Sequence, residues 1–163
     1  MTTPQTDRAT TAVIILAAGS GTRMKSDTPK MLHSVCGRTM LGHALHAAAG
    51  ISPDAIVVVV GHQRELVSEA VTEIAADLGV PVSTAVQEEQ NGTGDAVRAG
   101  MSGLPEGFEG TVLVTTSDIP LLDAETLGEV VTRHDMRPRA AVTVLTSTAP
   151  DPTGYGRIVR NDD

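Results

Sequence analysis

The sequence predicts an α/β fold built on a mostly parallel sheet with helices on both faces. Short apolar runs recur along the chain, and segments with helical spacing of apolar residues lie between them. This alternation is typical of βαβ units, which are joined by right-handed crossovers. The chain has 163 residues, of which 40% are hydrophobic and 20% are charged, and this suffices for one well-buried core.

Five runs carry the strand pattern. Three are continuous apolar runs of the kind that buried parallel strands show. A fourth has the same character, and a fifth contains Pro81 and therefore suits the edge of a sheet. In that order the runs are 12–17, 55–60, 111–116, 140–146 and 80–86.

Four segments carry the helix pattern. Residues 64–78 give the clearest example, because apolar side chains recur there at spacings of three and four and form one face. Asp123 precedes another segment and is predicted to cap its N-terminus. The predicted helices span residues 40–49, 64–78, 94–103 and 124–134.

The composition argues against several classes of partner. The chain carries 12 Lys and Arg against 20 Asp and Glu, a formal charge of −8, whereas duplex nucleic acid and anionic membranes attract basic surfaces. Phe108 and Tyr155 are the only aromatic residues, and single-stranded nucleic acid is usually bound on stacked aromatic side chains. We therefore expect neither a nucleic-acid nor a membrane partner.

The cysteine content suggests a cellular location, and the residues at the N-terminus suggest where the folded part begins. Cys36 is the single cysteine, which excludes an internal disulfide and is compatible with the reducing cytoplasm. We expect Cys36 to be a small, half-buried apolar residue. Residues 1–11 are predicted to be a disordered tail, and residues 12–163 to form the folded part.

The loop after the first predicted strand combines glycines with a local concentration of positive charge. Gly19 and Gly21 are followed by Arg23, Lys25 and Lys30, which include both lysines of the chain. Main-chain N–H groups of such a loop can hold phosphate oxygens, and an arginine can bind a phosphate through two hydrogen bonds. The pattern predicts a phosphate-binding loop in an otherwise acidic chain.

Two familiar glycine-rich loops are weaker alternatives. Met24 stands where a dinucleotide-binding fingerprint has its third glycine, and no acidic residue ends a second strand at the usual distance. Met24 also stands where a P-loop has the glycine before its lysine, here Lys25. A phosphate-binding loop of another kind fits better.

Four ordered blocks of sequence carry a family resemblance. Residues 16–33 match L-A-A-G-x-G-T-R-M-x-S-x-x-P-K-x-L-H without a gap. Residues 87–94 match Q-x-x-Q-x-G-T-G, residues 117–122 resemble G-D-x-P-L-L, and residues 151–158 match D-P-x-G-Y-G-R-I. With these blocks the chain resembles the sugar-phosphate nucleotidyltransferases, and among them the bacterial N-acetylglucosamine-1-phosphate uridyltransferases.

The resemblance implies a fold and a reaction. The fold is a Rossmann-like sheet of the nucleotide-diphospho-sugar transferase type. The reaction transfers a uridylyl group from UTP to N-acetylglucosamine 1-phosphate and releases pyrophosphate, with Mg²⁺ as cofactor. Such a transfer depends on positioning and charge neutralisation more than on a covalent nucleophile.

The resemblance also assigns roles to residues. Arg23 and Lys30 are expected to stabilise the transition state and the leaving pyrophosphate, and Asp118 to bind Mg²⁺. Gln87, Gly92 and Thr93 resemble uracil-reading positions, whereas Lys25 stays open between a phosphate contact and a solvated loop lysine. The expected nucleotide- and substrate-binding residues are Leu16, Ala17, Ala18, Gly19, Ser20, Gly21, Thr22, Lys30, Gln87, Gly92, Thr93, Thr116, Ser117, Asp118 and Gly156.

Two positions depart from the family pattern. Ser117 stands where a glycine usually precedes the aspartate, and it adds a Cβ atom near the expected ribose. Asp95 stands where the family commonly has a histidine. A carboxylate there would either repel a triphosphate or favour the first turn of a helix, and we prefer the helix interpretation.

The family pattern continues beyond the matched blocks, with the rest of the uridyltransferase domain and a β-helix acetyltransferase domain. The resemblance places the sugar-binding residues, a second Mg²⁺ ligand and the trimer contacts of the full-length family there. We therefore expect this chain to be a truncated domain that is monomeric or weakly associating, with a final strand near residues 157–160 whose edge is unpaired. A related nucleotidyltransferase with another acceptor, and a nucleotide-binding fragment without catalysis, stay open as alternatives to the uridyltransferase.

Overall fold

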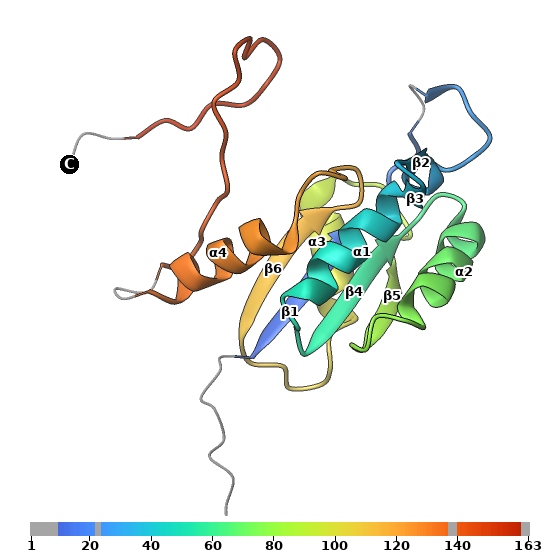
Figure 1. Ribbon diagram of the computed structural model, residues 1–163, viewed down its shortest axis with the longest axis horizontal. Helices are drawn as coiled ribbons and strands as arrows, with labels where there is room; N and C mark the ends of the chain where they lie inside the picture. Colours follow the sequence, from blue (N-terminus) through green and yellow to red (C-terminus); the bar gives the residue numbers. More distant parts are fainter. Residues whose placement is uncertain (1–9, 22–23, 137–139, 161–163) are drawn as a thin grey trace, which may run out of the picture.

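A computed structural model describes residues 10–21, 24–136 and 140–160 (Figure 1). Four parallel strands form the main sheet in the order β5-β4-β1-β6. They are β1 (Thr11–Leu16), β4 (Ala55–Val60), β5 (Val82–Val86) and β6 (Thr111–Thr116). Leu16 lies opposite both Val59 and Thr116, so the strands end together at one edge of the sheet.

Helices cover both faces of this sheet. Helices α1 (Met40–Gly50), α2 (Arg64–Ala75) and α4 (Ala124–Asp135) lie on one face, and α3 (Thr93–Ser102) lies on the other (Figure 1). Every residue of β4 is buried, as expected for a central strand covered on both sides. The predicted fold class is thereby confirmed.

A glycine lets α3 lie close against the sheet. A Cβ atom at Gly100 would come within 2.5 Å of Ile14 Cγ2 and 3.0 Å of Val59 Cγ2. Ala96, one turn earlier, is buried in the same small apolar cluster. The short side chains bring the first turn of α3 close to the carboxyl edge of the strands.

The predicted elements match the structure closely up to residue 135. The strands at 55–60 and 111–116 have the predicted bounds, and β5 lies at the sheet edge as its proline suggested. All four helices are present, with ends that differ by at most three residues. Asp123 accepts a hydrogen bond from the Thr126 N–H at 2.8 Å, which confirms the predicted N-cap.

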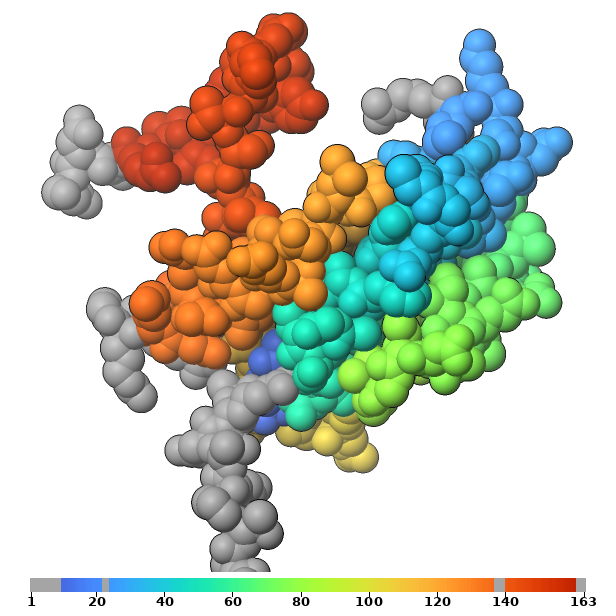
Figure 2. All heavy atoms as spheres, in the orientation of Figure 1, coloured from blue at the N-terminus to red at the C-terminus, as the bar shows by residue number. Residues whose placement is uncertain are grey.

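Two expectations about the C-terminal part are wrong. Residues 140–146 form no strand, and neither do residues 157–160. Val142 and Val144 are more than 60% exposed. The C-terminal segment projects from the body of the molecule (Figures 1 and 2). It pairs with none of the described strands, and a β-strand is stabilised only by pairing with a neighbour.

Cys36 also differs from expectation, because it is exposed. It lies with Gly37 in the two-residue turn between β2 (Ser34–Val35) and β3 (Arg38–Thr39), which form a small antiparallel pair. Both turn residues have positive φ, 52° and 82° respectively. Such a tight hairpin turn points its side chains into solvent.

The structure also bears on the chain's N-terminus and on membranes. The first strand begins at Thr11, one residue before the predicted boundary, and residues 1–9 lie outside the described part. Among the described helices, none has the length and apolar character needed to cross a membrane.

Candidate nucleotide-binding site

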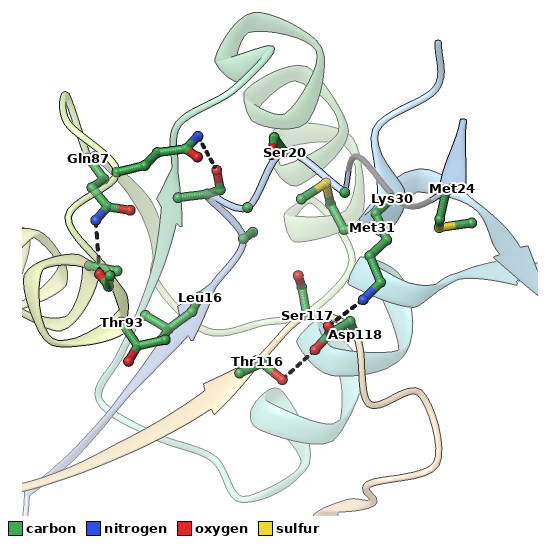
Figure 3. A pocket seen from close by; sticks show the side chains of 17 residues that line it. Leu16, Ser20, Met24, Lys30, Met31, Gln87, Thr93, Thr116, Ser117 and Asp118 are labelled. Atoms are coloured by element: carbon green, nitrogen blue, oxygen red, sulfur yellow. Dashed lines mark hydrogen bonds and ion pairs between the residues drawn. The ribbon is translucent and has the colours of Figure 1, made fainter. Parts of the chain in front are cut away.

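A pocket of about 520 Å³ opens at the carboxyl ends of the strands, where open α/β sheets commonly bind ligands (Figure 3). Its walls come from the loops after β1, β5 and β6, from the first turn of α3 and from the short helix η2 (Lys30–Leu32). It is lined by Leu16, Ala17, Ala18, Gly19, Ser20, Gly21, Met24, Lys30, Met31, Gln87, Gln90, Gly92, Thr93, Ala96, Thr116, Ser117 and Asp118.

One end of the pocket, which we call the charged end, consists of Lys30, Thr116 and Asp118. Lys30 Nζ lies 2.7 Å from Asp118 Oδ2, and Thr116 Oγ1 donates a hydrogen bond of 2.7 Å to Asp118 Oδ1. Two hydrogen bonds hold the pKa of Asp118 below its ordinary value: the one from Lys30 has the larger effect, and the one from Thr116 the smaller. Both ionic side chains are 38% exposed, so they remain open to a ligand.

The loop after β1 is shaped to bring Lys30 into the pocket. Ala17 N–H donates to Val59 O at 2.8 Å, which extends the pairing of β1 one residue beyond the strand. Gly21 then turns the chain with a φ of 58°, and a Cβ atom there would lie 2.7 Å from Lys30 Cβ. Glycine at this position therefore allows both the turn and the close approach of Lys30.

The opposite end, which we call the amide end, consists of Gln87, Gly92 and Thr93 (Figure 3). Gln87 is 6% exposed and follows β5, where its N–H donates to Val60 O at 2.8 Å. Its Nε2 donates to Gly92 O at 3.1 Å and to Asp95 Oδ2 at 3.0 Å. Gly92, with a φ of 94°, is the N-cap residue of α3.

A second glutamine ties the two loops together. Gln90 Nε2 donates to Ala18 O at 3.0 Å, so the loop after β5 is fastened to the loop after β1. Ser117 does the same for β6, because its N–H donates to Leu16 O at 3.0 Å and its side chain is buried. These hydrogen bonds connect the loops that follow β1, β5 and β6 at the carboxyl edge of the sheet.

The structure brings most of the predicted site residues into this one pocket. Thr22 and Arg23 lie outside the described residues. Gly156 lies in the exposed segment after residue 140 and does not line the pocket, and Lys25 is exposed and does not line it either. The functional roles of all these residues stay predictions.

Four lining residues were not predicted: Met24, Met31, Gln90 and Ala96. Gln90 is the second amide of the Q-x-x-Q block, so its place in that motif was the available signal. Met31 is buried behind Lys30, and only the fold reveals that it reaches the pocket. The interpretation of Asp95 as a residue in the first turn of a helix is confirmed, since α3 begins at Thr93.

The charged end can hold a hard divalent cation. Asp118 is the one carboxylate among the described residues that line the pocket, and those residues contain no group of three or more His, Cys, Asp and Glu side chains arranged for a metal. Mg²⁺ is commonly bound by one or two carboxylates with phosphate oxygens and water completing its shell. Asp118 fits that pattern if Lys30 yields one carboxylate oxygen and turns to a phosphate.

Comparisons with known proteins agree with this fold. Residues 13–161 match the model of the MobA-like NTP transferase domain. The chain belongs to this family. Sequence relatives include the bifunctional protein GlmU of Rhodococcus opacus (strain B4), 62% identical over 151 residues, which are 92% of this chain and 30% of the relative. GlmU of Mycobacterium sp. (strain KMS) is 52% identical over 163 residues, all of this chain and 32% of the relative.

The MobA-like domain described here therefore spans about 30% of the length of these curated relatives. Among solved structures, the UDP-glucose pyrophosphorylase from Acinetobacter baumanii superposes with a TM-score of 0.63 at 18% identity, covering 77% of this chain and 52% of that one. A nucleotidyl transferase from Methanothermobacter thermautotroptrophicus (Mth528) gives 0.61 at 19% identity, covering 76% and 57%. These two similarities establish the nucleotidyltransferase fold.

Proposed function

We propose that this domain binds UTP with Mg²⁺ and transfers its uridylyl group to N-acetylglucosamine 1-phosphate. The products are UDP-N-acetylglucosamine and pyrophosphate. The observation that carries the proposal is that one pocket holds a lysine–aspartate pair at one end and a buried glutamine amide at the other. A nucleoside triphosphate offers the matching groups, phosphates at one end and a base at the other.

The charged end supplies the chemistry of phosphoryl transfer. A phosphate oxygen of the sugar phosphate attacks the α-phosphorus, a new P–O bond forms, and the bond to the β-phosphate breaks as pyrophosphate leaves. Lys30 donates to the phosphate oxygens on which negative charge collects, and the proposal gives Arg23 the same role. Mg²⁺ held by Asp118 supplies further charge neutralisation.

The amide end supplies base recognition. Uracil presents two carbonyl acceptors and one N–H donor, which an amide side chain and nearby backbone groups can satisfy. Gln87 is suited to that task because its amide lies on the pocket wall beside the backbone of Gly92 and Thr93, where α3 begins. The apolar Leu16 and Ala96 provide the surfaces beside the base.

The identity of the acceptor rests on the similarity of sequence. GlmU relatives with 52–62% identity and the D-P-x-G-Y-G-R-I block at 151–158 support N-acetylglucosamine 1-phosphate over other acceptors. The proposal includes a role in cell-wall precursor synthesis, a cytoplasmic location and a monomeric or weakly associating chain.

A second candidate function is nucleotide binding without turnover. It is favoured by the charged end, where Asp118 is the one carboxylate among the described residues that line the pocket. In this alternative the nucleotide is bound but the acceptor is not held in line with it, and positioning accounts for much of such a rate enhancement.

The deciding experiment measures pyrophosphate release from UTP, N-acetylglucosamine 1-phosphate and Mg²⁺, beside UTP binding by calorimetry on the same sample. Turnover that is lost in Asp118→Ala supports the transferase. UTP binding without turnover supports the second candidate. Preference for CTP in a parallel titration would point to a related nucleotidyltransferase, and absence of binding would overturn the proposal.

A further inference from the structure

Asp95 is linked directly to the glutamine of the amide end. It lies in the first turn of α3, one side-chain layer behind the pocket, and its side chain is 27% exposed. Asp95 Oδ2 accepts from Gln87 Nε2 at 3.0 Å, and Asp95 Oδ1 lies 3.4 Å from Arg98 Nη1. The same Gln87 nitrogen donates to Gly92 O at 3.1 Å.

These neighbours allow only one orientation of the Gln87 amide. A carboxylate and a backbone carbonyl both accept hydrogen bonds, and neither can donate one. If the amide were rotated by 180°, its oxygen would face two acceptors and its nitrogen would lose two partners. The network therefore fixes the assignment of oxygen and nitrogen, which geometry alone leaves open in a glutamine.

The fixed orientation leaves the Gln87 carbonyl oxygen available. Both hydrogens of Nε2 are engaged, and within the described residues Oε1 accepts no hydrogen bond. Figure 3 places this oxygen on the side of the amide that faces the interior of the pocket. A ligand at this end therefore meets an acceptor on a largely buried side chain.

We propose that Asp95 is a positioning residue that sets base selectivity by holding Gln87 with its acceptor toward the base. The inference rests on the proposed binding of a nucleoside triphosphate in this pocket. Uracil carries an N–H at position 3 of its pairing edge, whereas cytosine carries a lone pair there. An acceptor that cannot flip favours uracil, and an amide free to flip accepts either base.

Two other roles of Asp95 make different predictions. A carboxylate that only repels the phosphates weakens UTP and CTP equally. A carboxylate that only supports the start of α3 affects folding stability and both nucleotides alike. The ratio of the two affinities therefore isolates the positioning role.

The test measures dissociation constants of UTP and CTP with Mg²⁺ by calorimetry for the full chain and three variants. Asp95→Ala removes the acceptor for Gln87, Asp95→Asn removes the charge but keeps an acceptor oxygen, and Arg98→Ala is the control that leaves the Gln87 bond in place. Urea unfolding of each variant, and the side-chain amide NMR signals of Gln87, check that the fold is retained.

We expect the preference for UTP over CTP to fall about three- to tenfold in Asp95→Ala, as loss of one buried hydrogen bond would produce. We expect Asp95→Asn and Arg98→Ala to keep the wild-type preference. An unchanged ratio in Asp95→Ala overturns the inference, as does an equal change for both nucleotides in Asp95→Ala and Asp95→Asn.

The wild-type titrations separate this inference from the function on which it rests. Wild-type protein that binds UTP and CTP equally overturns the role of Asp95 and leaves a nucleotide site in place. Wild-type protein that binds neither nucleotide overturns the proposed function and the inference with it.

Discussion

The two ends of the pocket lie on the same sheet edge but are built in different ways. At the charged end, Lys30 and Asp118 form an ion pair, and each of the two side chains is 38% exposed. At the amide end, the neutral side-chain amide of Gln87 donates to two acceptors, and the residue is 6% exposed. The charged end can therefore rearrange when phosphates and a cation arrive, whereas the amide end is ordered before the ligand arrives.

This difference suits what each end is proposed to bind. Phosphates carry several charges, and partly exposed side chains can exchange their own ion pair for contacts with the ligand at little cost. A base offers a few directional hydrogen bonds, and selectivity depends on protein groups that cannot turn to suit the wrong base.

The largest effect is expected from Asp118→Ala at the charged end. The variant removes the carboxylate proposed to hold Mg²⁺, so we expect pyrophosphate release to fall by about two to three orders of magnitude. The gain in UTP affinity that Mg²⁺ provides should disappear as well, which calorimetry measures even without turnover. Uridine binding at the amide end should be unchanged.

Asp123→Ala is the matched control for that variant. Asp123 is an exposed aspartate that caps α4 and does not line the pocket. We expect a small loss of stability from the missing N-cap and unchanged UTP affinity. Equal losses of UTP affinity in the two variants would contradict the role of Asp118.

Lys30→Met is expected to have the next largest effect. Loss of the ammonium group removes a donor to the phosphates, and we expect turnover to fall by about one to two orders of magnitude. Pyrophosphate affinity should fall with it, whereas the UTP-to-CTP preference should stay as in wild type. A changed base preference would show that the two ends are coupled.

A pair of glycine substitutions sharpens the comparison further. Gly21→Ala places a Cβ atom 2.7 Å from Lys30 Cβ, whereas Gly92→Ala meets no atom within 4 Å and strains only a backbone with a φ of 94°. Each should cost about 1–3 kcal/mol of stability by urea unfolding. Gly21→Ala should weaken pyrophosphate binding and Gly92→Ala uridine binding, so the reverse pattern would contradict our assignment of the ends.

The smallest expected effect concerns pH. The hydrogen bond from Lys30 lowers the pKa of Asp118 from its ordinary value of 3.8, so the ionised form is favoured in the folded state. The stability gained is present above pH 3.8 and is lost as the pH falls through the lowered pKa. Because the pair is partly exposed, we expect less than about 1 kcal/mol.

NMR titration of the Asp118 carboxyl carbon checks this directly. In Lys30→Met the pKa should rise toward the ordinary value, because the largest cause of the shift is gone. An unchanged pKa would mean that Thr116, which also donates to this carboxylate, dominates.

The sheet, the helices and most of the pocket lining could be predicted from the amino-acid sequence. Apolar runs such as 55–60 are long enough and uniform enough to be buried strands, and local spacing decides a helix such as α2. The motif at 16–33 is sufficient to predict that the loop after β1 and Lys30 line a site. A strand run, a helical spacing and a motif each consist of residues that are close together along the chain, so the sequence alone predicts them.

Which of these residues touch one another depends on the three-dimensional arrangement. Residues 140–146 have the composition of a strand but find no neighbouring strand, and pairing is a property of two segments. Gln90 and Met31 reach the pocket because separate loops meet at the sheet edge. The bond between Asp95 and Gln87 joins residues eight apart across a turn into α3, and only its geometry fixes which atom of the amide faces the pocket.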